Sequence, residues 1–402
     1  MKFLFLVITE LIFCSSVFAD ECAIAHSAIE KASEVRGLKV LHQVPCRLST
    51  KEDVEKYLKA TIEKKVSREK MKYEERVFKA LGIIPQNYDY LNGVIKLYRD
   101  QLGGYYDPDK KYYVMAKWLP EVMQLPIAIH ELTHALQDQH FNLKMISEYE
   151  TEPSDSLMAR SALIEGDASA VMTDYTRKFG GRPALRDDPD IESVMLENIS
   201  GAMLSSSLSE TPPALQALLV FPYVSGLRFV HSLLRSGGYA DVDKAFKKLP
   251  ESCEEILHPE KYQIRRRDFK ELDPYFPESV ANGKKHKVLY KDRLGEFLIS
   301  SLLGTFVSPV TASSAAMGWG GDKVAVLEGD NGKQIITWNT AWDSEKDAQE
   351  FYETLIAAYN KRFGNTEESA ESKKFSDTAS WDSKEQKTSL HYTGKSVTVV
   401  VD

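Results

Sequence analysis

One segment of the chain reads Ala128-Ile129-His130-Glu131-Leu132-Thr133-His134-Ala135-Leu136-Gln137-Asp138-Gln139-His140, a His-Glu-x-x-His motif inside an apolar, helix-forming run. Residues four apart lie on one face of a helix, so His130 and His134 can direct both imidazoles at one point. Such a pair supplies two of the three protein ligands of an open, tetrahedral zinc site. Glu131 would then be the general base of metal-assisted hydrolysis.

The flanking residues favour a metal site over an ordinary helix that happens to carry histidines. Leu125-Pro126 places a proline early in the predicted helix, where its missing N–H costs least. Ile127, Leu132 and Leu136 form an apolar seam at helical spacing. We therefore predict a metal site on this helix.

A second helix-like segment, residues 158–170, offers the third ligand. Glu165 is the one acid in it preceded by an apolar run, which suggests a carboxylate directed into the protein. An acid in that position is costly unless it meets a cation or a proton. The alternative is an ordinary, partly exposed glutamate; we predict the ligand. Gly166 and the alanines around it should let this helix pack closely against the histidine helix.

These segments resemble the gluzincin metallopeptidases, the thermolysin-like clan, and more closely a set of uncharacterised secreted bacterial proteins of that clan. Four motifs carry the resemblance, at residues 130–141, 162–168, 222–226 (Pro-Tyr-x-x-Gly) and 258–262 (His-Pro-x-x-Tyr). The first two are the more specific. The resemblance runs from about residue 104 to residue 262 and implies Zn²⁺ as cofactor, held by His130, His134 and Glu165. A zinc-activated water would attack the peptide bond, with Glu131 as general base.

The resemblance has two further implications for the site. Gluzincins use a Tyr or His to donate a hydrogen bond to the developing oxyanion. Tyr223 and His258 match the family motifs and either could serve, while His231 is a weaker candidate. Gluzincins also place a small sheet before the histidine helix, and its edge strand pairs with the substrate backbone. Residues 112–115 are the candidate edge, the alternative being a plain hairpin that covers the helix.

The sequence departs from the family pattern at one position. Many gluzincins carry an Asp four residues after the ligand Glu, which supports the first zinc histidine, whereas this chain has Ser169. Zinc histidines nearly always need an acceptor for the other ring nitrogen. Asp167 should point away from Glu165 on a regular helix. Asp138 and Asp174 are therefore the candidates for that acceptor.

The N-terminus has the features of a signal peptide, residues 1–19, with a short basic start, an apolar stretch and small residues before Asp20. We expect an exported protein, periplasmic or secreted, with a retained anchor as the alternative. No segment beyond the leader reads as a membrane span. Cleavage would remove Cys14 and leave Cys22, Cys46 and Cys253, which suggests a Cys22–Cys46 bridge and one spare thiol.

The patterns predict an α+β fold class, with a mainly helical, zincin-like catalytic domain, a small sheet before the His-Glu-x-x-His helix, and a small C-terminal α+β domain. The expected divisions are residues 1–19, the signal peptide; 20–103, an N-terminal helical region; 104–277, the catalytic domain; and 278–402, the C-terminal domain. Residues 20–100 could alternatively form a pro-region that masks the cleft.

Helices are expected at residues 51–81 (two helices), 88–102, 190–208, 212–236 and 343–363, strands at 323–327, 334–337 and 389–401, and a turn at 318–322. The C-terminal part has no chemical motif and could cap the cleft, select substrates or dimerise.

Composition narrows the function further. The formal net charge is −8 and no basic stripe is present, which argues against nucleic-acid binding. We expect an exported zinc metallopeptidase with a peptide or protein substrate and no membrane association after signal cleavage. The sequence leaves open the substrate and the oligomeric state. Two alternatives stand beside this one: a zinc amidase acting on cell-wall peptides, and a non-catalytic binding protein on a metallopeptidase fold.

Overall fold

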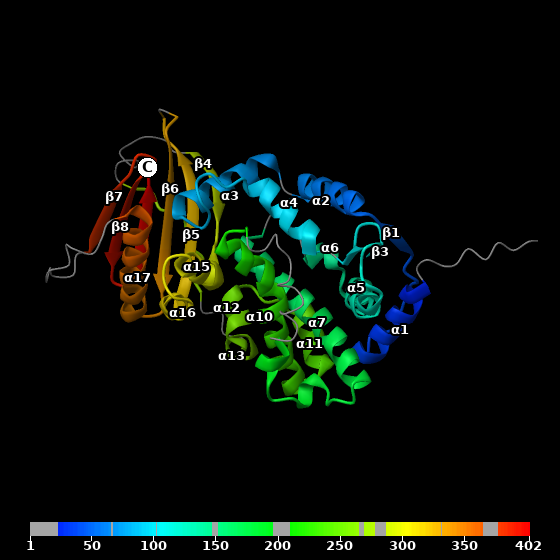
Figure 1. Ribbon diagram of the computed structural model, residues 1–402. Helices are drawn as coiled ribbons and strands as arrows, with labels where there is room; N and C mark the ends of the chain where they lie inside the picture. The colour runs from blue at the N-terminus through cyan, green and yellow to red at the C-terminus, as the bar shows by residue number, and fades with distance from the viewer. Residues whose placement is uncertain are drawn as a thin grey trace, which may run out of the picture.

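A computed structural model describes residues 23–65, 67–101, 103–146, 152–195, 210–264, 269–277, 287–330, 332–364 and 377–402. The protein is mixed α+β, as predicted (Figure 1). A helical part holds the His-Glu-x-x-His helix beside a three-stranded sheet, and a six-stranded antiparallel sheet lies towards the C-terminus. The predicted signal peptide and Cys22 lie outside the described residues.

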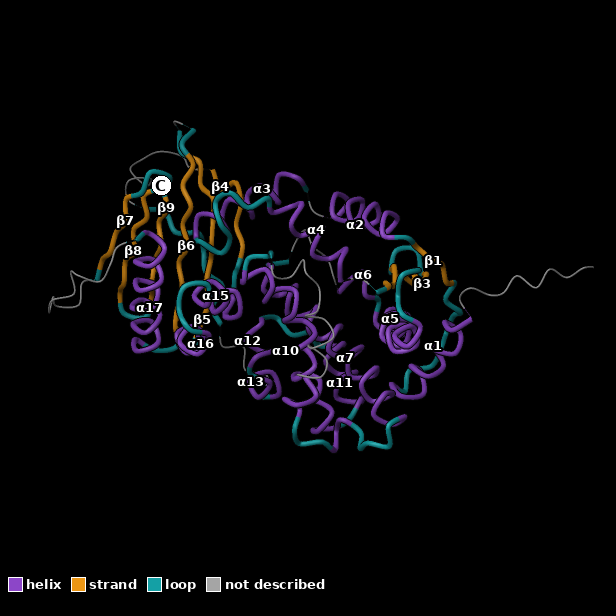
Figure 2. The backbone as a smooth tube through the Cα atoms, in the orientation of Figure 1, coloured by secondary structure: helices purple, strands orange, loops and turns teal. Residues whose placement is uncertain are grey.

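Figure 2 separates the mainly helical part of the chain from the C-terminal strands. The first part contains α1 (Ala23–Arg36), β1 (Cys46–Ser49), α2 (Lys51–Lys65), α3 (Arg68–Leu81), α4 (Tyr90–Gln101), β2 (Gly104–Asp107), β3 (Tyr112–Ala116), α5 (Glu121–Phe141), α6 (Leu143–Ile146), α7 (Ser154–Phe179), η1 (Leu185–Asp187), α10 (Pro213–Gly237), α11 (Tyr239–Lys247), α12 (Cys253–Leu257) and α13 (Pro259–Gln263). The second contains β4 (Lys287–Asp292), α15 (Gly295–Gly304), α16 (Pro309–Ala316), β5 (Trp319–Glu328), β6 (Gln334–Trp342), α17 (Glu345–Phe363), β7 (Thr378–Asp382), β8 (Lys387–Thr393) and β9 (Ser396–Val401).

The small sheet has the order β1-β3-β2. The hairpin given above as the alternative is present as β2 and β3. Its connection is closed by the Asp107 carboxylate, which accepts the N–H groups of Asp109 and Lys110. The prediction that residues 112–115 form an edge is wrong, because β3 is central and pairs in parallel with β1. Among the described strands, β1 and β2 form the two edges of this sheet, and β2 is the edge that contacts α5. Only the tertiary structure brings the distant strand β1 to this sheet.

Helices α7 and α10 cross at Gly166 and Gly226. A Cβ on Gly166 would lie 2.2 Å from the Gly226 carbonyl oxygen, and one on Gly226 would lie 2.1 Å from the Ala162 carbonyl oxygen. Backbone therefore meets backbone, which only glycine allows. The expectation that Gly166 lets α7 approach the histidine helix is wrong, since the close approach is to α10. This contact also accounts for the glycine of the Pro-Tyr-x-x-Gly motif.

The predicted helix at residues 212–236 is α10, whose core face packs along α7. By length and composition alone, α10 is apolar enough to cross a membrane, which corrects the expectation that no such segment follows the leader. Half of its most apolar window is buried within the protein. The predicted helix at 190–208 extends beyond the described residues.

The N-terminal region does not form a unit of its own. Helix α1 packs Ala28, Ile29 and Ala32 against α5, while α3 packs Val77 and Phe78 into the core of the C-terminal sheet. Because these residues belong to two cores, their removal would expose apolar surface in both. The pro-region alternative is therefore disfavoured for α1 and α3.

The C-terminal sheet has the order β4-β5-β6-β9-β8-β7, and α15, α16 and α17 contribute to its core. The predicted helix and strands are present, with residues 389–401 divided into β8 and β9. The turn expected at residues 318–322 is present only at Gly318, whose φ is +80°. Trp319 already begins β5, and the register shifts before Gly321 as in a β-bulge. Cys46 is disulfide-bonded, and Cys253 is a buried free thiol.

Candidate metal centre

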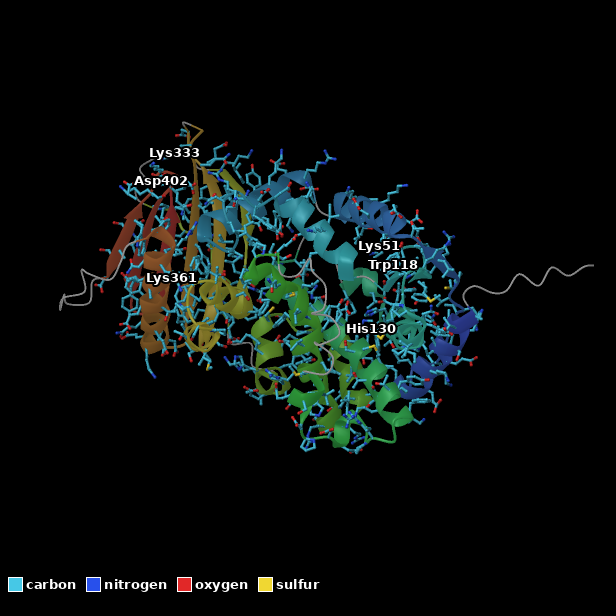
Figure 3. All side chains as sticks on the ribbon, in the orientation of Figure 1. Lys51, Trp118, His130, Lys333, Lys361 and Asp402 are labelled. Carbon is cyan, nitrogen blue, oxygen red and sulfur yellow. The ribbon has the colours of Figure 1, made fainter. Side chains whose placement is uncertain are left out.

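Helices α5 and α7 bring the three predicted ligands together. The Nε2 atoms of His130 and His134 lie 3.1 and 3.4 Å from Oε2 of Glu165. The candidate ligand atoms of all three residues lie within 4.8 Å of one another. His130 lies in the helical part, away from Lys333 and Asp402 of the C-terminal sheet (Figure 3).

These separations fit a tetrahedral ion. Zinc binds imidazole nitrogen and carboxylate oxygen at about 2.0–2.1 Å, so two ligand atoms at the tetrahedral angle lie about 3.4 Å apart. The two nitrogen–oxygen distances at the triad are 3.1 and 3.4 Å. Among the described residues these two nitrogens and one oxygen are the only grouped ligand atoms, which leaves a fourth position for water. The triad can therefore hold a metal ion, and its donor set is one that zinc accepts.

A buried chain of polar side chains supports His134. Its Nδ1 lies 2.9 Å from Oε1 of Gln137, and the Gln137 amide donates to Oδ2 of Asp167 at 2.9 Å. Asp167 in turn accepts from Nε of Arg36 on α1, and all three supporting side chains are buried. Because an amide oxygen can only accept, Nδ1 is the donor, which leaves the Nε2 lone pair for a metal.

The expected acceptors Asp138 and Asp174 do not support the histidines. Asp138 accepts from the Tyr106 hydroxyl and Lys111, and Asp174 from the Leu185 N–H and the Tyr239 hydroxyl. Gln137 was missed, although it lies three residues after His134 and thus on the same helix face. Asp167, set aside in the sequence analysis, accepts from the Gln137 amide and so acts on His134 through Gln137.

Replacing Gln137 by Ala is expected to weaken zinc binding about 10- to 100-fold, because the ring of His134 loses the acceptor that fixes its orientation. The dissociation constant is measured by competition with a chelator. Gln139→Ala is the matched control, since Gln139 lies on the same helix but bonds to the backbone of Leu41 and His42 at the surface. Equal affinities in the two variants would exclude the supporting role of Gln137.

Glu131 is held beside the triad by the small sheet. Its Oε2 accepts the backbone N–H of Tyr106 at 3.1 Å. Tyr106 belongs to β2, and this bond leaves the strand on the side away from β3. Burial raises the pKa of Glu131, while the neighbouring His130 and His134 oppose the rise. A carboxylate with a raised pKa accepts a proton more readily, which suits a general base.

Proton release should accompany metal binding. Burial favours the neutral imidazole of His134, but the Glu165 carboxylate overcomes it and raises the pKa of His134 to about 9. At neutral pH the metal-free triad therefore holds a proton that a metal must displace. Apparent zinc affinity should rise about tenfold per pH unit up to about pH 9.

This proton is counted by calorimetry at pH 7 in buffers of different ionisation enthalpy, where we expect about one proton released per zinc bound. Zinc binding without proton release would mean that His134 is neutral before the metal arrives.

Of the other predicted site residues, one lies beside the triad and two lie elsewhere. Tyr223 lies beside the triad, with its ring centroid 6.1 Å from that of His130, and the residue is 42% exposed. His258 is not brought to the triad: its Nε2 lies 2.9 Å from a Glu296 carboxylate oxygen, between α12 and α15. His231 contacts the carbonyl oxygens of Leu185 and Asp188 and ties α10 to η1.

Comparison with known proteins addresses only the C-terminal part of the chain. A family model described as "Domain of unknown function (DUF8575)" matches residues 286–402. No curated protein and no solved structure matches the chain. The matched range contains β4 to β9 and α15 to α17, and none of the triad residues.

Proposed function

We propose that this protein is an exported zinc metallopeptidase of the gluzincin type, with a zincin-like arrangement of its helical part. The observation that carries the proposal is the position of the Glu131 carboxylate, which interacts electrostatically with all three side chains of the candidate triad at zinc-like spacing. Structural metal sites are usually closed by four protein ligands. Three ligands with a held carboxylate beside them favour catalysis instead.

A bound zinc would supply a Lewis acid that polarises the scissile carbonyl and lowers the pKa of water. Glu131 would accept the proton of the attacking water and later give it to the leaving amine. The backbone N–H of Tyr106 keeps the Glu131 carboxylate oriented. Of the two oxyanion candidates, Tyr223 is the better placed to donate a hydrogen bond to the scissile carbonyl oxygen, because its ring lies beside that of His130.

The open edge of β2 supports a peptide as the substrate. An extended peptide can add to an exposed sheet edge through backbone hydrogen bonds. Tyr106 on this strand directs its N–H at the general base. A peptide backbone along β2 would therefore pass close to Glu131 and the triad.

The test is the metal content of the purified protein, wild type beside Glu165→Ala. We expect about one zinc per chain in the wild type and loss of the metal in the variant, because two histidines alone leave the site incomplete. Glu192→Ala, an exposed glutamate paired with Arg228, is the control. Zinc in both proteins would mean that Glu165 is not a ligand and that the clan assignment fails. No metal in either, after zinc has been supplied, would favour the binding-protein alternative.

A further inference from the structure

A cavity of about 460 Å³ reaches the triad through His134 and Glu165. Its volume falls within the range of about 300–1,000 Å³ found for pockets that enclose small molecules. Beyond the two metal-binding side chains the lining is mostly aliphatic and aromatic. The cavity therefore offers the reacting centre an adjoining apolar space.

One wall is a face of α7. Leu157, Met158, Ser161 and Ile164 follow one another at intervals of one, three and three residues and lead to the ligand Glu165. Helical spacing places them on the side of α7 that carries Glu165. Leu157 and Met158 are only half-buried, so apolar side chains are left facing the cavity.

A second wall is the first half of α10. Leu215, Leu218, Leu219 and Pro222 lie on one helix face, and Leu218 and Leu219 are half-buried. Phe221 of the same helix stacks on Phe297, with ring centroids 3.8 Å apart. This stacking joins α10 to α15, the helix that supplies the third wall.

The third wall comes from the C-terminal domain. Leu294, Phe297 and Leu298, at the start of α15, line the cavity although they lie within the residues that match the domain of unknown function. The C-terminal domain, which contains neither the triad nor Glu131, thus lines the apolar space next to the triad.

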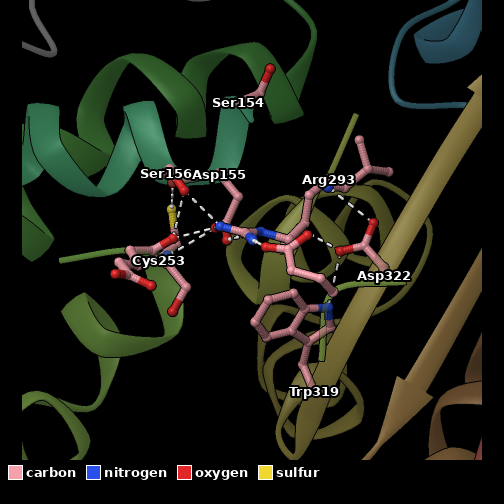
Figure 4. Close-up of polar contacts among 12 residues, drawn as sticks. Ser154, Asp155, Ser156, Cys253, Arg293, Trp319 and Asp322 are labelled. Carbon is pink, nitrogen blue, oxygen red and sulfur yellow. Dashed lines mark hydrogen bonds and ion pairs between the residues drawn. The ribbon is translucent and has the colours of Figure 1, made fainter. Parts of the chain in front are cut away.

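A buried network of polar side chains connects the start of α15 to α7, the helix that carries Glu165 (Figure 4). Arg293 donates through Nε to Oδ2 of Asp155, near the start of α7, at 3.1 Å. Asp322 of β5 accepts the N–H groups of Leu294 and Gly295, each at 2.9 Å. Because the side chains of Asp155, Arg293 and Asp322 are all buried, the start of α15 is held in one position relative to α7.

We propose that the C-terminal domain completes the specificity pocket of the site through Leu294, Phe297 and Leu298, and that the pocket takes large apolar side chains of a peptide substrate. This inference rests on the proposed peptidase function. A peptide is the occupant we commit to because Tyr106 and Pro108, from β2 and the turn after it, also line the cavity. A strand paired with β2 would direct alternate side chains into it.

The test uses alkyl hydroxamates, which bind a metal through one constant headgroup while the chain length varies. For the zinc-loaded protein we expect affinity to rise about fourfold per added methylene from acetohydroxamate to hexanohydroxamate and then to level off. Acetohydroxamate binding with no gain from longer chains would overturn the pocket alone. A gain that continues to dodecanohydroxamate would identify an acyl chain as the occupant and overturn the peptide assignment. No hydroxamate binding at all would overturn the metal site and, with it, this inference.

Two variants should change, in opposite directions, the alkyl chain length at which hydroxamate affinity stops rising. Phe297→Ala enlarges the third wall and should extend the rise to longer chains, whereas Leu219→Trp fills the cavity and should end it earlier. Ile299→Ala is the matched control, because Ile299 is fully buried on α15 but does not line the cavity. Circular dichroism checks that both proteins are folded. If wild type and Phe297→Ala then show the same dependence of hydroxamate affinity on chain length, the C-terminal domain does not contribute to the pocket.

Discussion

Glu131→Gln is expected to keep one zinc per chain and to lower kcat about 10²- to 10⁴-fold, the usual contribution of a general base. The amide has the shape of the carboxylate and can still accept the Tyr106 N–H through its oxygen. It cannot take the proton of an attacking water. The measurement pairs kcat on the best substrate from a peptide library with metal analysis of the same sample.

The matched control is Glu121→Gln, at the exposed start of α5 and on the same helix as Glu131. This variant should match the wild type in both readouts. Full activity of Glu131→Gln would remove Glu131 from the proposed mechanism. Loss of zinc from it would instead make Glu131 a metal ligand and change the proposed coordination.

Gly226→Ala is expected to lower the free energy of unfolding by about 3 kcal/mol, at the upper end of the usual cost of overpacking. Its new methyl group would lie 2.1 Å from the Ala162 carbonyl oxygen, and neither backbone can move without shifting a whole helix. Separation of α7 from α10 would also displace Glu165, one residue before Gly166, and Tyr223, three residues before Gly226. Zinc affinity should therefore fall together with stability.

Denaturant unfolding of the metal-free proteins measures the first effect, and chelator competition measures the second. Gly180→Ala is the control at the end of α7, where a Cβ would meet its nearest atom at 3.5 Å, an ordinary contact. A Gly226→Ala protein as stable as this control would show that the two helices can separate freely, contrary to the proposed crossing.

The local part of the candidate site follows from the order of residues along α5 and α7. The four-residue spacing of His130 and His134 is a property of one helix, so no other part of the chain is needed to align them. Glu165 could be predicted because a carboxylate after an apolar run needs a compensating charge. The role of Gln137 could also have been predicted, since it lies only three residues after His134 on the same helix. The main helices follow from the same periodicity.

Contacts between segments far apart in the chain could be seen only in the folded protein. Arg36 reaches Asp167 across 131 residues of sequence. Likewise, β1 makes β3 a central strand, and α15 lines one cavity together with residues of α3, α4, α7 and α10. Periodicity shows which face of an element is apolar, whereas the partner that covers the face depends on the packing of the whole chain. For this reason the three residues of the candidate metal triad could be picked out from the sequence, while the side chains that support His134, the free edge of β2 and the apolar pocket could not.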